Sequence, residues 1–329
     1  MDDDVVRPLP LLGAYALAPA DPAGSRALHE GVAALGVGGL ELPLPAEPLT
    51  DAGVWDVDPT WDLLVTCVPT VMGRLADDAA YGLASADDDA RRRAVADVAR
   101  AATFARRLAD RAGRERVVGI EVHSAPGPRG GSAEAFTRSL DELLAVDLAG
   151  ARLLVEHCDE RVGDRPAAKG FLPLGDELAA VGRAAGVGVA VNWGRSAIEG
   201  RSTATPVEHV RAARAAGVLG AVVLSGATDA PTAWGDAWGD AHIPPRGDAP
   251  ALAASAASLL GVDEVRATLA AAGPASLVAV KVSVRPRDAS VEARLAVARA
   301  SLALVAAARE RLARATPEDA HPLTDEVAR

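Results

Sequence analysis

The sequence predicts an α/β fold, a single (β/α)8 barrel. Eight short apolar runs alternate with longer Ala-, Arg- and Leu-rich segments of helical period along the 329 residues. This alternation is typical of parallel strands joined by helices, and eight such units in a chain of this length favour a closed barrel. A doubly wound open sheet would show the same alternation and is the structural alternative. No linker rich in Ser or Gly divides the chain.

The elements follow from the positions of these runs. Strands are predicted near residues 11–19, 38–45, 62–70, 117–126, 151–159, 187–196, 219–228 and 276–284. Helices are predicted near residues 25–36, 87–112, 132–146, 173–186, 204–216, 251–272 and 290–314. The link "AEPLTDAGVWDVDPTW" is the weak point, and no full helix is expected there. We expect one domain over residues 1–329, with a C-terminal tail at 315–329.

Composition narrows the classes of partner. The net charge of −11 argues against nucleic acids and anionic membranes as partners. No apolar run reaches transmembrane length, and the acidic, proline-broken start "MDDDVVRPLP" does not resemble a signal peptide. Cys67 and Cys158 are the only cysteines, so a reduced, cytoplasmic protein is expected. The expected partner is a small-molecule substrate, and the sequence leaves a homo-oligomer open.

Each predicted strand offers a polar residue near its C-terminal end. Alternate strand residues point into a barrel, and active sites of such barrels form at the C-terminal ends of the strands. The inward candidates are Tyr15, Glu41, Thr66 or Cys67, Glu121 with His123, Glu156, Asn192, Ser225, and Lys281 with Ser283. One polar group per strand at a similar height predicts the floor of a polar pocket.

Lys281 is the most unusual of these residues. It interrupts the apolar run "VAVKVSV", and a lone amine in an apolar strand is costly unless a partner compensates it. Three carboxylates are candidate partners across the barrel mouth: Glu41, Glu121 and Glu156. A buried ion pair that only fixes the barrel register is the structural alternative.

The other candidates also have structural alternatives. Glu41 and Glu121 would face helices and reach solvent if the strand parity were shifted by one residue. His123 would be a core histidine bonded to a carbonyl group. Asn192 and Ser225 would satisfy backbone groups of the following turns.

Two loops offer anion-binding arginines. Arg129 lies in "PGPRGG" before a predicted helix start, where Gly-rich backbone and an arginine can hold an anion. Arg285 follows the last strand, in the region where barrels often bind phosphate. A phosphate, carboxylate or sulfonate on the substrate would suit either arginine.

The long loop at residues 226–248 follows the seventh strand and is predicted to be a lid. It carries Trp234, Trp238 and His242, and long loops on this face are usually lids or binding loops. Indole rings stack well on the C–H surfaces of sugars. Trp193, one residue after Asn192, is expected to wall the same pocket.

Three strand endings carry a resemblance to a known superfamily. "GLELPLP", "EVHSAP" and "LLVEHCD" resemble the xylose isomerase-like TIM barrels, which include sugar and sugar-phosphate isomerases and epimerases and an endonuclease branch. In particular, the chain resembles a domain-of-unknown-function family within that superfamily. The resemblance implies the barrel fold over nearly the whole chain and matches Glu41, His123 and Glu156 to common site residues.

The resemblance also implies a divalent metal, but most of its ligands are missing. Members commonly hold the metal with acidic residues ending strands 5 and 6, a histidine ending strand 7 and a glutamate ending strand 8. Only Glu156 carries over, because the other three positions hold Asn192, Ser225 and Lys281. We therefore expect no cofactor, with the Lys281 ammonium replacing the metal electrostatically.

A shifted metal site formed by Glu121, His123 and Glu156, with Asp159 as a further ligand, is the less favoured alternative. The acidic chain and the incomplete metal set argue against the endonuclease branch.

The leading functional hypothesis is an isomerase or epimerase acting on a small hydroxylated, sugar-like compound. Glu156 and Glu121 are the expected acid/base pair, while Lys281 and His123 would polarise the carbonyl group. The remaining candidates would bind substrate. One alternative is a Schiff-base lyase or aldolase that uses Lys281 with a lowered pKa. Another is a non-catalytic sugar-binding or sensing barrel that has lost its metal.

Overall fold

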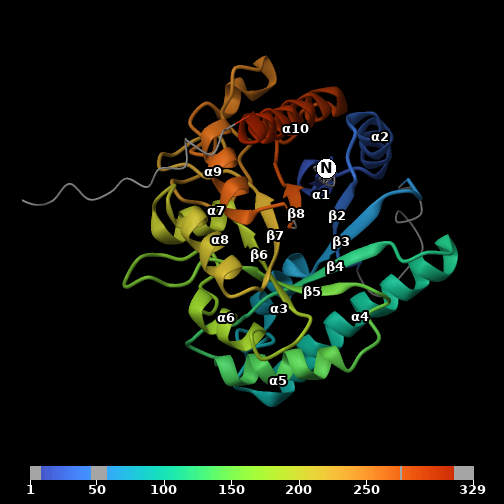
Figure 1. Ribbon diagram of the computed structural model, residues 1–329, viewed down its shortest axis with the longest axis vertical. Helices are drawn as coiled ribbons and strands as arrows, with labels where there is room; N and C mark the ends of the chain where they lie inside the picture. Colours follow the sequence, from blue (N-terminus) through green and yellow to red (C-terminus); the bar gives the residue numbers. More distant parts are fainter. Residues whose placement is uncertain (1–8, 46–57, 275, 315–329) are drawn as a thin grey trace, which may run out of the picture.

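The sheet is a closed barrel of eight parallel strands, as the sequence predicts (Figure 1). The computed structural model describes residues 9–45, 58–274 and 276–314. The strands are β1 (Leu11–Leu12), β2 (Gly39–Pro43), β3 (Asp62–Thr66), β4 (Val117–Val122), β5 (Arg152–His157), β6 (Gly188–Asn192), β7 (Leu219–Leu224) and β8 (Leu277–Val280). Because β1 pairs with both β2 and β8, the sheet closes on itself, and the open-sheet alternative is wrong.

Helices surround the barrel (Figure 1). They are α1 (Ala14–Leu17), α2 (Pro22–Val32), α3 (Val68–Asp77), α4 (Asp88–Ala112), α5 (Ala133–Leu144), α6 (Leu174–Val181), α7 (Trp193–Gly200), α8 (Thr205–Ala215), α9 (Val262–Ala272) and α10 (Val291–Arg314), with 3-10 turns at Ala33–Leu35 and Pro250–Ser255. α10 packs against α2, so the last helix closes the ring beside the first long one. The helix expected over residues 251–272 begins as a 3-10 turn and becomes α-helical only at Val262.

Several apolar runs leave the sheet earlier than the sequence predicts. The first run turns into α1 after two strand residues, so Tyr15 lies in a helix rather than at a strand end. The sixth run turns into α7 at Trp193. Asn192 caps this helix, because its Oδ1 accepts the backbone N–H of Arg195 at 3.3 Å. A strand ends where its neighbouring strands stop pairing with it. The composition of a single apolar run does not reveal that position.

The barrel interior has an apolar layer and a polar layer. The apolar layer consists of Leu11, Leu64, Leu154, Ala190, Ala221, Val223 and Ala279. Glu156, Asn192 and Lys281 each follow a residue of this layer by two positions, so they point to the same side of the sheet. The polar layer therefore lies toward the C-terminal ends of the strands, where the sequence predicts the pocket floor.

Two predictions fall on residues outside the described part of the chain. The weak link between β2 and β3 falls largely on residues 46–57, and the C-terminal tail is residues 315–329. Within the described ranges, every helix is too short or too polar to span a bilayer.

Candidate active site

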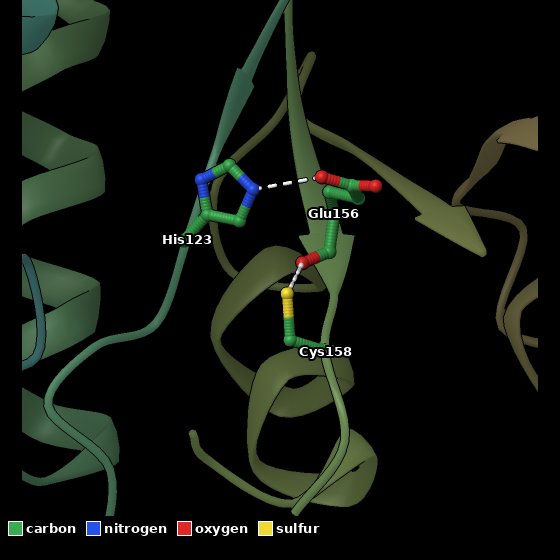
Figure 2. Close-up of side chains that lie close together, drawn as sticks. All are labelled: His123, Glu156 and Cys158. Atoms are coloured by element: carbon green, nitrogen blue, oxygen red, sulfur yellow. Dashed lines mark hydrogen bonds and ion pairs between the residues drawn. The ribbon is translucent and has the colours of Figure 1, made fainter. Parts of the chain in front are cut away.

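Glu156, near the end of β5, is the centre of the polar layer. Its Oε2 lies 2.8 Å from His123 Nε2 and 2.7 Å from Arg195 Nη1. Its Oε1 accepts a hydrogen bond from Asn192 Nδ2 at 3.0 Å and lies 3.9 Å from Lys281 Nζ. Figure 2 shows His123 and Glu156 facing each other from neighbouring strands. Groups from four other elements thus converge on one carboxylate, and all of them are buried.

These surroundings keep Glu156 ionised. Burial alone would raise its pKa, but the charges of Arg195 and Lys281 and the hydrogen bond from His123 hold the pKa well below its usual range. Burial lowers the pKa of His123, so its ring is neutral and donates Nε2–H to the carboxylate. The His123 Nδ1 atom is buried without a hydrogen-bond partner among the described residues, which leaves it a free lone pair.

Lys281, just beyond β8, pairs with Glu41 of β2. Its Nζ lies 2.6 Å from Glu41 Oε1, and Tyr15 Oη donates to the same oxygen at 3.5 Å. The ammonium lies 5.2 Å from the centroid of the Tyr15 ring, within the range of a cation–π contact. Gly13 makes room for the pair, since a Cβ there would lie 3.0 Å from Lys281 Cγ. Of the three carboxylates expected as partners, Glu41 is the close one.

The Lys281 ammonium is held in its charged form. Burial alone would lower its pKa, but the charges of Glu156 and Glu41 raise the pKa well above its usual value. A Schiff-base lysine needs the opposite, because only the free amine attacks a carbonyl carbon. The expectation of a lowered pKa is therefore wrong: the apolar strand is local, and two carboxylates face the amine across the barrel.

Glu121, on β4, is the unsatisfied member of the layer. It is fully buried, and neither carboxyl oxygen has a hydrogen-bond partner among the described residues. Burial first, and then the charges of Glu156 and Glu41, raise its pKa well above the usual value, so the carboxyl group is neutral. Glu41 Oε2 and His123 Nδ1 are also unpartnered. These atoms come from β2 and the end of β4, so one side of the mouth offers free polar groups to a ligand.

A roof of charged residues covers the polar layer. Asp240, in the loop after β7, lies 3.2 Å from Arg195 Nε and 3.2 Å from Lys169 Nζ. His242 Nδ1 lies 3.4 Å from Asp240 and 3.0 Å from Ser225 Oγ. Burial lowers the pKa of His242 to about 4, so this ring is neutral. The roof joins the loop after β7 to α7 and to the loop after β5.

The loop at 226–248 lies closed over the mouth. Trp234 is 8% exposed, and its Nε1 donates to Ser283 Oγ, beyond β8, at 3.0 Å. Trp238 instead lies over the end of α7, where the Arg201 guanidinium is 5.1 Å from its ring centroid. The two tryptophans expected in one pocket therefore occupy different places: Trp234 ties the loop to the barrel, and Trp238 packs outside it.

A cavity of about 410 Å³ lies beside the roof. Its polar lining includes Asp240, His242, Ser283, Arg285 and Arg287. Arg285 is therefore near the mouth, as the sequence predicts. Asp240 and His242 line this cavity and also belong to the roof over the polar layer, so the cavity borders the roof.

Three residues considered for the pocket lie elsewhere. Arg129 is exposed on a loop that is tied to the α3–α4 connection by the hydrogen bond from Ala86 N to Gly130 O at 2.9 Å. Trp193 is fully buried in the core between the sheet and the helices, since it starts α7 instead of continuing β6. The Asp159 carboxylate accepts the backbone N–H groups of residues 168 and 169 and fixes their loop.

A family model described as a domain of unknown function, DUF4862, matches residues 11–297. The chain belongs to this family. The match runs from β1 into α10 and so includes every strand of the barrel. The chain is also 35% identical over 219 residues to the uncharacterized protein STM3670 of Salmonella typhimurium (strain LT2). The matched stretch covers 63% of this chain and 67% of that protein.

Solved structures with the same fold include two sugar epimerases. The L-ribulose 3-epimerase structure matches with a TM-score of 0.56 and 15% identity, over 94% of this chain and 98% of that chain. The D-psicose 3-epimerase of Clostridium cellulolyticum H10, solved with D-tagatose, matches with a TM-score of 0.52 and 17% identity, over 92% of this chain and 98% of that chain. At such identities the likeness shows the fold alone, and it confirms the fold implied by the resemblance to xylose isomerase-like barrels.

The residues around Glu156 do not fit the divalent metal that the resemblance implies. His123, Glu156 and Cys158 place candidate ligand atoms within 4.8 Å of one another. However, a permanent cation already contacts the Cys158 sulfur, because Arg195 Nη1 lies 3.1 Å from Cys158 Sγ. Arg195 and Lys281 already compensate Glu156, so a metal there would lie beside two permanent cations.

Arg195 and Asp240 are the important residues that the sequence analysis missed. Arg195 bridges Glu156 and Asp240, because its Nη1 contacts Glu156 and its Nε contacts Asp240. It lies in the first turn of α7, a helix that was not predicted because residues 187–196 were assigned to the sixth strand, and Asp240 lies in a loop selected for its tryptophans. The only available signal was the short spacing from Asn192 to Arg195, which suits an N-cap.

Proposed function

We propose that the protein is an isomerase or epimerase that moves a proton at a carbon next to the carbonyl group of a small, sugar-like compound. The observation that carries this proposal is Glu121, a buried neutral carboxyl group with no partner for either oxygen among the described residues. A general acid needs a proton to give at neutral pH, and a raised pKa supplies it. The sugar epimerases that share the fold support the substrate class.

The two groups at the end of β4 suit the two halves of a proton transfer. Glu121 holds a proton, while His123 Nδ1 holds a free lone pair and can accept one. The residues are two apart in sequence and so project from the same face of the chain. We therefore assign the acid/base roles to Glu121 and His123, in place of Glu121 and Glu156.

The cations of the layer suit the charge that forms during the reaction. Loss of a proton beside a carbonyl group sends an electron pair toward the carbonyl oxygen, and fixed positive charges stabilise the resulting oxyanion. Lys281 is a permanent ammonium, and Arg195 is held between Glu156 and Asp240. Glu156, ionised and surrounded by donors, orients these groups and His123 rather than carrying a proton itself.

The remaining candidates would bind the substrate. Tyr15, Glu41, Asn192 and Ser225 offer hydrogen bonds to hydroxyl groups. Arg285, on the entrance cavity, would favour a substrate with an anionic group. Trp234 would close over the bound compound with its loop.

Solvent-exchange NMR tests the proposal without knowledge of the substrate. The protein is incubated in D2O with a panel of neutral, phosphorylated and carboxylated aldoses and ketoses. Proton transfer would put deuterium on the carbon next to the carbonyl group of the accepted compound. We expect exchange with the parent protein and with Glu30→Gln, an exposed matched control on α2, and exchange about 10²- to 10⁴-fold slower with Glu121→Gln.

Two other results would redirect the proposal. Saturable binding with no exchange for any compound would favour the non-catalytic sugar-binding barrel. Borohydride trapping of a carbonyl compound on Lys281 would restore the Schiff-base reading, against the raised pKa of that lysine.

A further inference from the structure

A second buried cluster lies on the outer side of β5. His157 follows Glu156 and points in the opposite direction, between the sheet and the helices. Its Nε2 lies 3.0 Å from Glu199 Oε2, at the end of α7. The other oxygen of Glu199 lies 3.3 Å from Nε2 of His209, on α8. Three elements therefore contribute two imidazoles and one carboxylate, and the roles proposed for the barrel mouth use none of them.

Both imidazoles are oriented by a partner on the other ring nitrogen. Glu177 Oε2 lies 2.7 Å from His157 Nδ1, and Ser124 Oγ donates to the second oxygen of Glu177 at 2.5 Å. Ser196 Oγ lies 3.0 Å from His209 Nδ1. Each histidine thus presents its Nε2 to Glu199. A carboxylate behind a histidine is the arrangement that fixes the ring and raises its basicity in zinc sites.

We propose that His157, Glu199 and His209 form a binding site for a divalent transition-metal ion, best matched by zinc. Zinc prefers imidazole nitrogen and carboxylate oxygen at about 2.0–2.2 Å, so ligand atoms around a tetrahedral ion lie about 3.3 Å apart. The His157 and His209 Nε2 atoms lie 3.0 and 3.3 Å from the two different oxygens of Glu199, close to that spacing. One ligand atom from each of the three residues lies within 4.8 Å of the other two.

Charge and access also suit an ion here. Glu177 pairs with His157, and Glu199 pairs with His157 and His209, so the ion pairs of both carboxylates are with imidazoles. A divalent cation would take the place of the proton between His157 Nε2 and Glu199 and would balance the two carboxylates. The side chains of Glu199 and His209 are 8% and 14% exposed, which leaves a fourth position open to water.

The site would clamp α7 and α8 to the end of β5. Glu199 lies four residues after Arg195 on α7, one helical turn away. An ion held by Glu199 would therefore fix the helix that aims Arg195 at Glu156. The proposed role is a structural one that positions the mouth from outside.

Calorimetric titration of the EDTA-treated protein with Zn²⁺ alone tests the site. We expect one ion per chain for the parent protein, and binding weakened at least about 10- to 100-fold by Glu177→Gln and further by His209→Gln. His29→Gln removes a partly buried histidine from α2 and is the matched control, with unchanged binding. His123→Gln, at the barrel mouth, should also bind zinc as the parent does.

An imidazole NMR spectrum of the parent protein keeps the test independent of variants that fail to fold. Zn²⁺ should shift the resonances of His157 and His209 and leave that of His29 in place. The proposal is overturned if the parent binds no zinc, because hydrogen bonds and ion pairs between the histidines and Glu199 then account for the cluster without a metal. It is equally overturned if His123→Gln abolishes binding and His209→Gln preserves it, which would put the ion in the barrel.

Discussion

Glu156 and His157 are neighbours in sequence, yet they organise two different clusters on opposite faces of β5. Inside the barrel, Glu156 is compensated by Arg195 and Lys281, whose charges are permanent. Outside it, Glu199 is compensated by His157 and His209, whose charges depend on exchangeable protons. Both clusters combine carboxylates with imidazoles, but the inner one is fully buried while Glu199 and His209 of the outer one are partly exposed. They differ in whether a metal ion could bind: it could replace protons on the outer imidazoles, but it could not replace the charges of Arg195 and Lys281.

The second difference is whether the polar atoms of each cluster have hydrogen-bond partners. Inside, Glu121 and one atom each of Glu41 and His123 lack partners among the described residues, while both ring nitrogens of His157 are bonded outside. Buried polar atoms without partners cost about 1–3 kcal/mol each, so they persist where a ligand or a reaction uses them. This difference agrees with the chemical role that we propose for the inner cluster and the structural role that we propose for the outer one.

The largest expected effect comes from Glu121→Gln, which removes the proposed proton carrier without changing its shape. Turnover should fall about 10²- to 10⁴-fold, the usual contribution of a general acid or base. The melting temperature should hold or rise, because a neutral group replaces a neutral group. Rates come from the exchange assay and stability from thermal melts. An active Glu121→Gln protein would contradict the contrast between the two clusters.

The next effect concerns the ion pair of Lys281. Lys281→Met should destabilise the fold by about 3–5 kcal/mol, because it leaves Glu41 buried and uncompensated. The double variant Lys281→Met with Glu41→Gln should recover most of that stability. Denaturant unfolding of the single and double variants gives the free energy of interaction between Lys281 and Glu41.

The activity of the same two variants distinguishes a structural role of Lys281 from a catalytic one. If Lys281 stabilises the oxyanion, the double variant folds and is inactive. A stable and active double variant would show that the pair only fixes the barrel register.

A smaller effect is expected for the lid. Trp234→Phe removes the hydrogen bond to Ser283 and should weaken closure of the loop at 226–248 by about 0.5–1.5 kcal/mol. Amide exchange across the loop should become faster. Trp238→Phe is the matched control, because that ring packs on Arg201 and not on the barrel. Equal exchange in both variants would remove Trp234 from its role as an anchor.

The smallest effect is a pH dependence of the same loop. His242 has a pKa of about 4 in the closed roof, against about 6.5 for an unperturbed histidine. A depressed pKa means that its contribution to closure is complete above about pH 6.5 and is lost as the pH falls toward 4. Asp240, which favours the charged ring, is outweighed by burial and by Lys281 and Arg195.

Tryptophan emission between pH 7 and 4 measures this opening. The parent protein should show a transition in that window, and His242→Gln should flatten it. A transition of unchanged size in His242→Gln would assign the effect to another group.

The repeating pattern of the sequence was sufficient to predict the barrel and most of the polar layer. Eight apolar runs gave the strand number, and inward alternation placed Glu41, Glu121, Glu156 and Asn192 on one side of the sheet. These properties are local, because a strand has a period of two residues whatever surrounds it. By the same rule, His157 lies on the opposite face from Glu156.

Where each strand stops was not predictable from its own residues. Tyr15 and Trp193 lie in helices because pairing ends at the neighbouring strands, and this placed Trp193 in the core. Arg195 and Asp240 come from a helix turn and a long loop, which carry no alternation to reveal their direction. Their meeting over Glu156 depends on how two distant segments pack.

By itself, the sequence determined which residues face the inside of the barrel and that Lys281 needs a partner. Only the tertiary structure decided that Glu41 is the close partner, that Lys281 stays charged, that Glu121 is neutral and that Glu156 is ionised. The physical reason is that pKa values depend on enclosure and on distances between charges. Lys281 and Glu41 are 240 positions apart in the chain and 2.6 Å apart in space, and no local pattern encodes that separation.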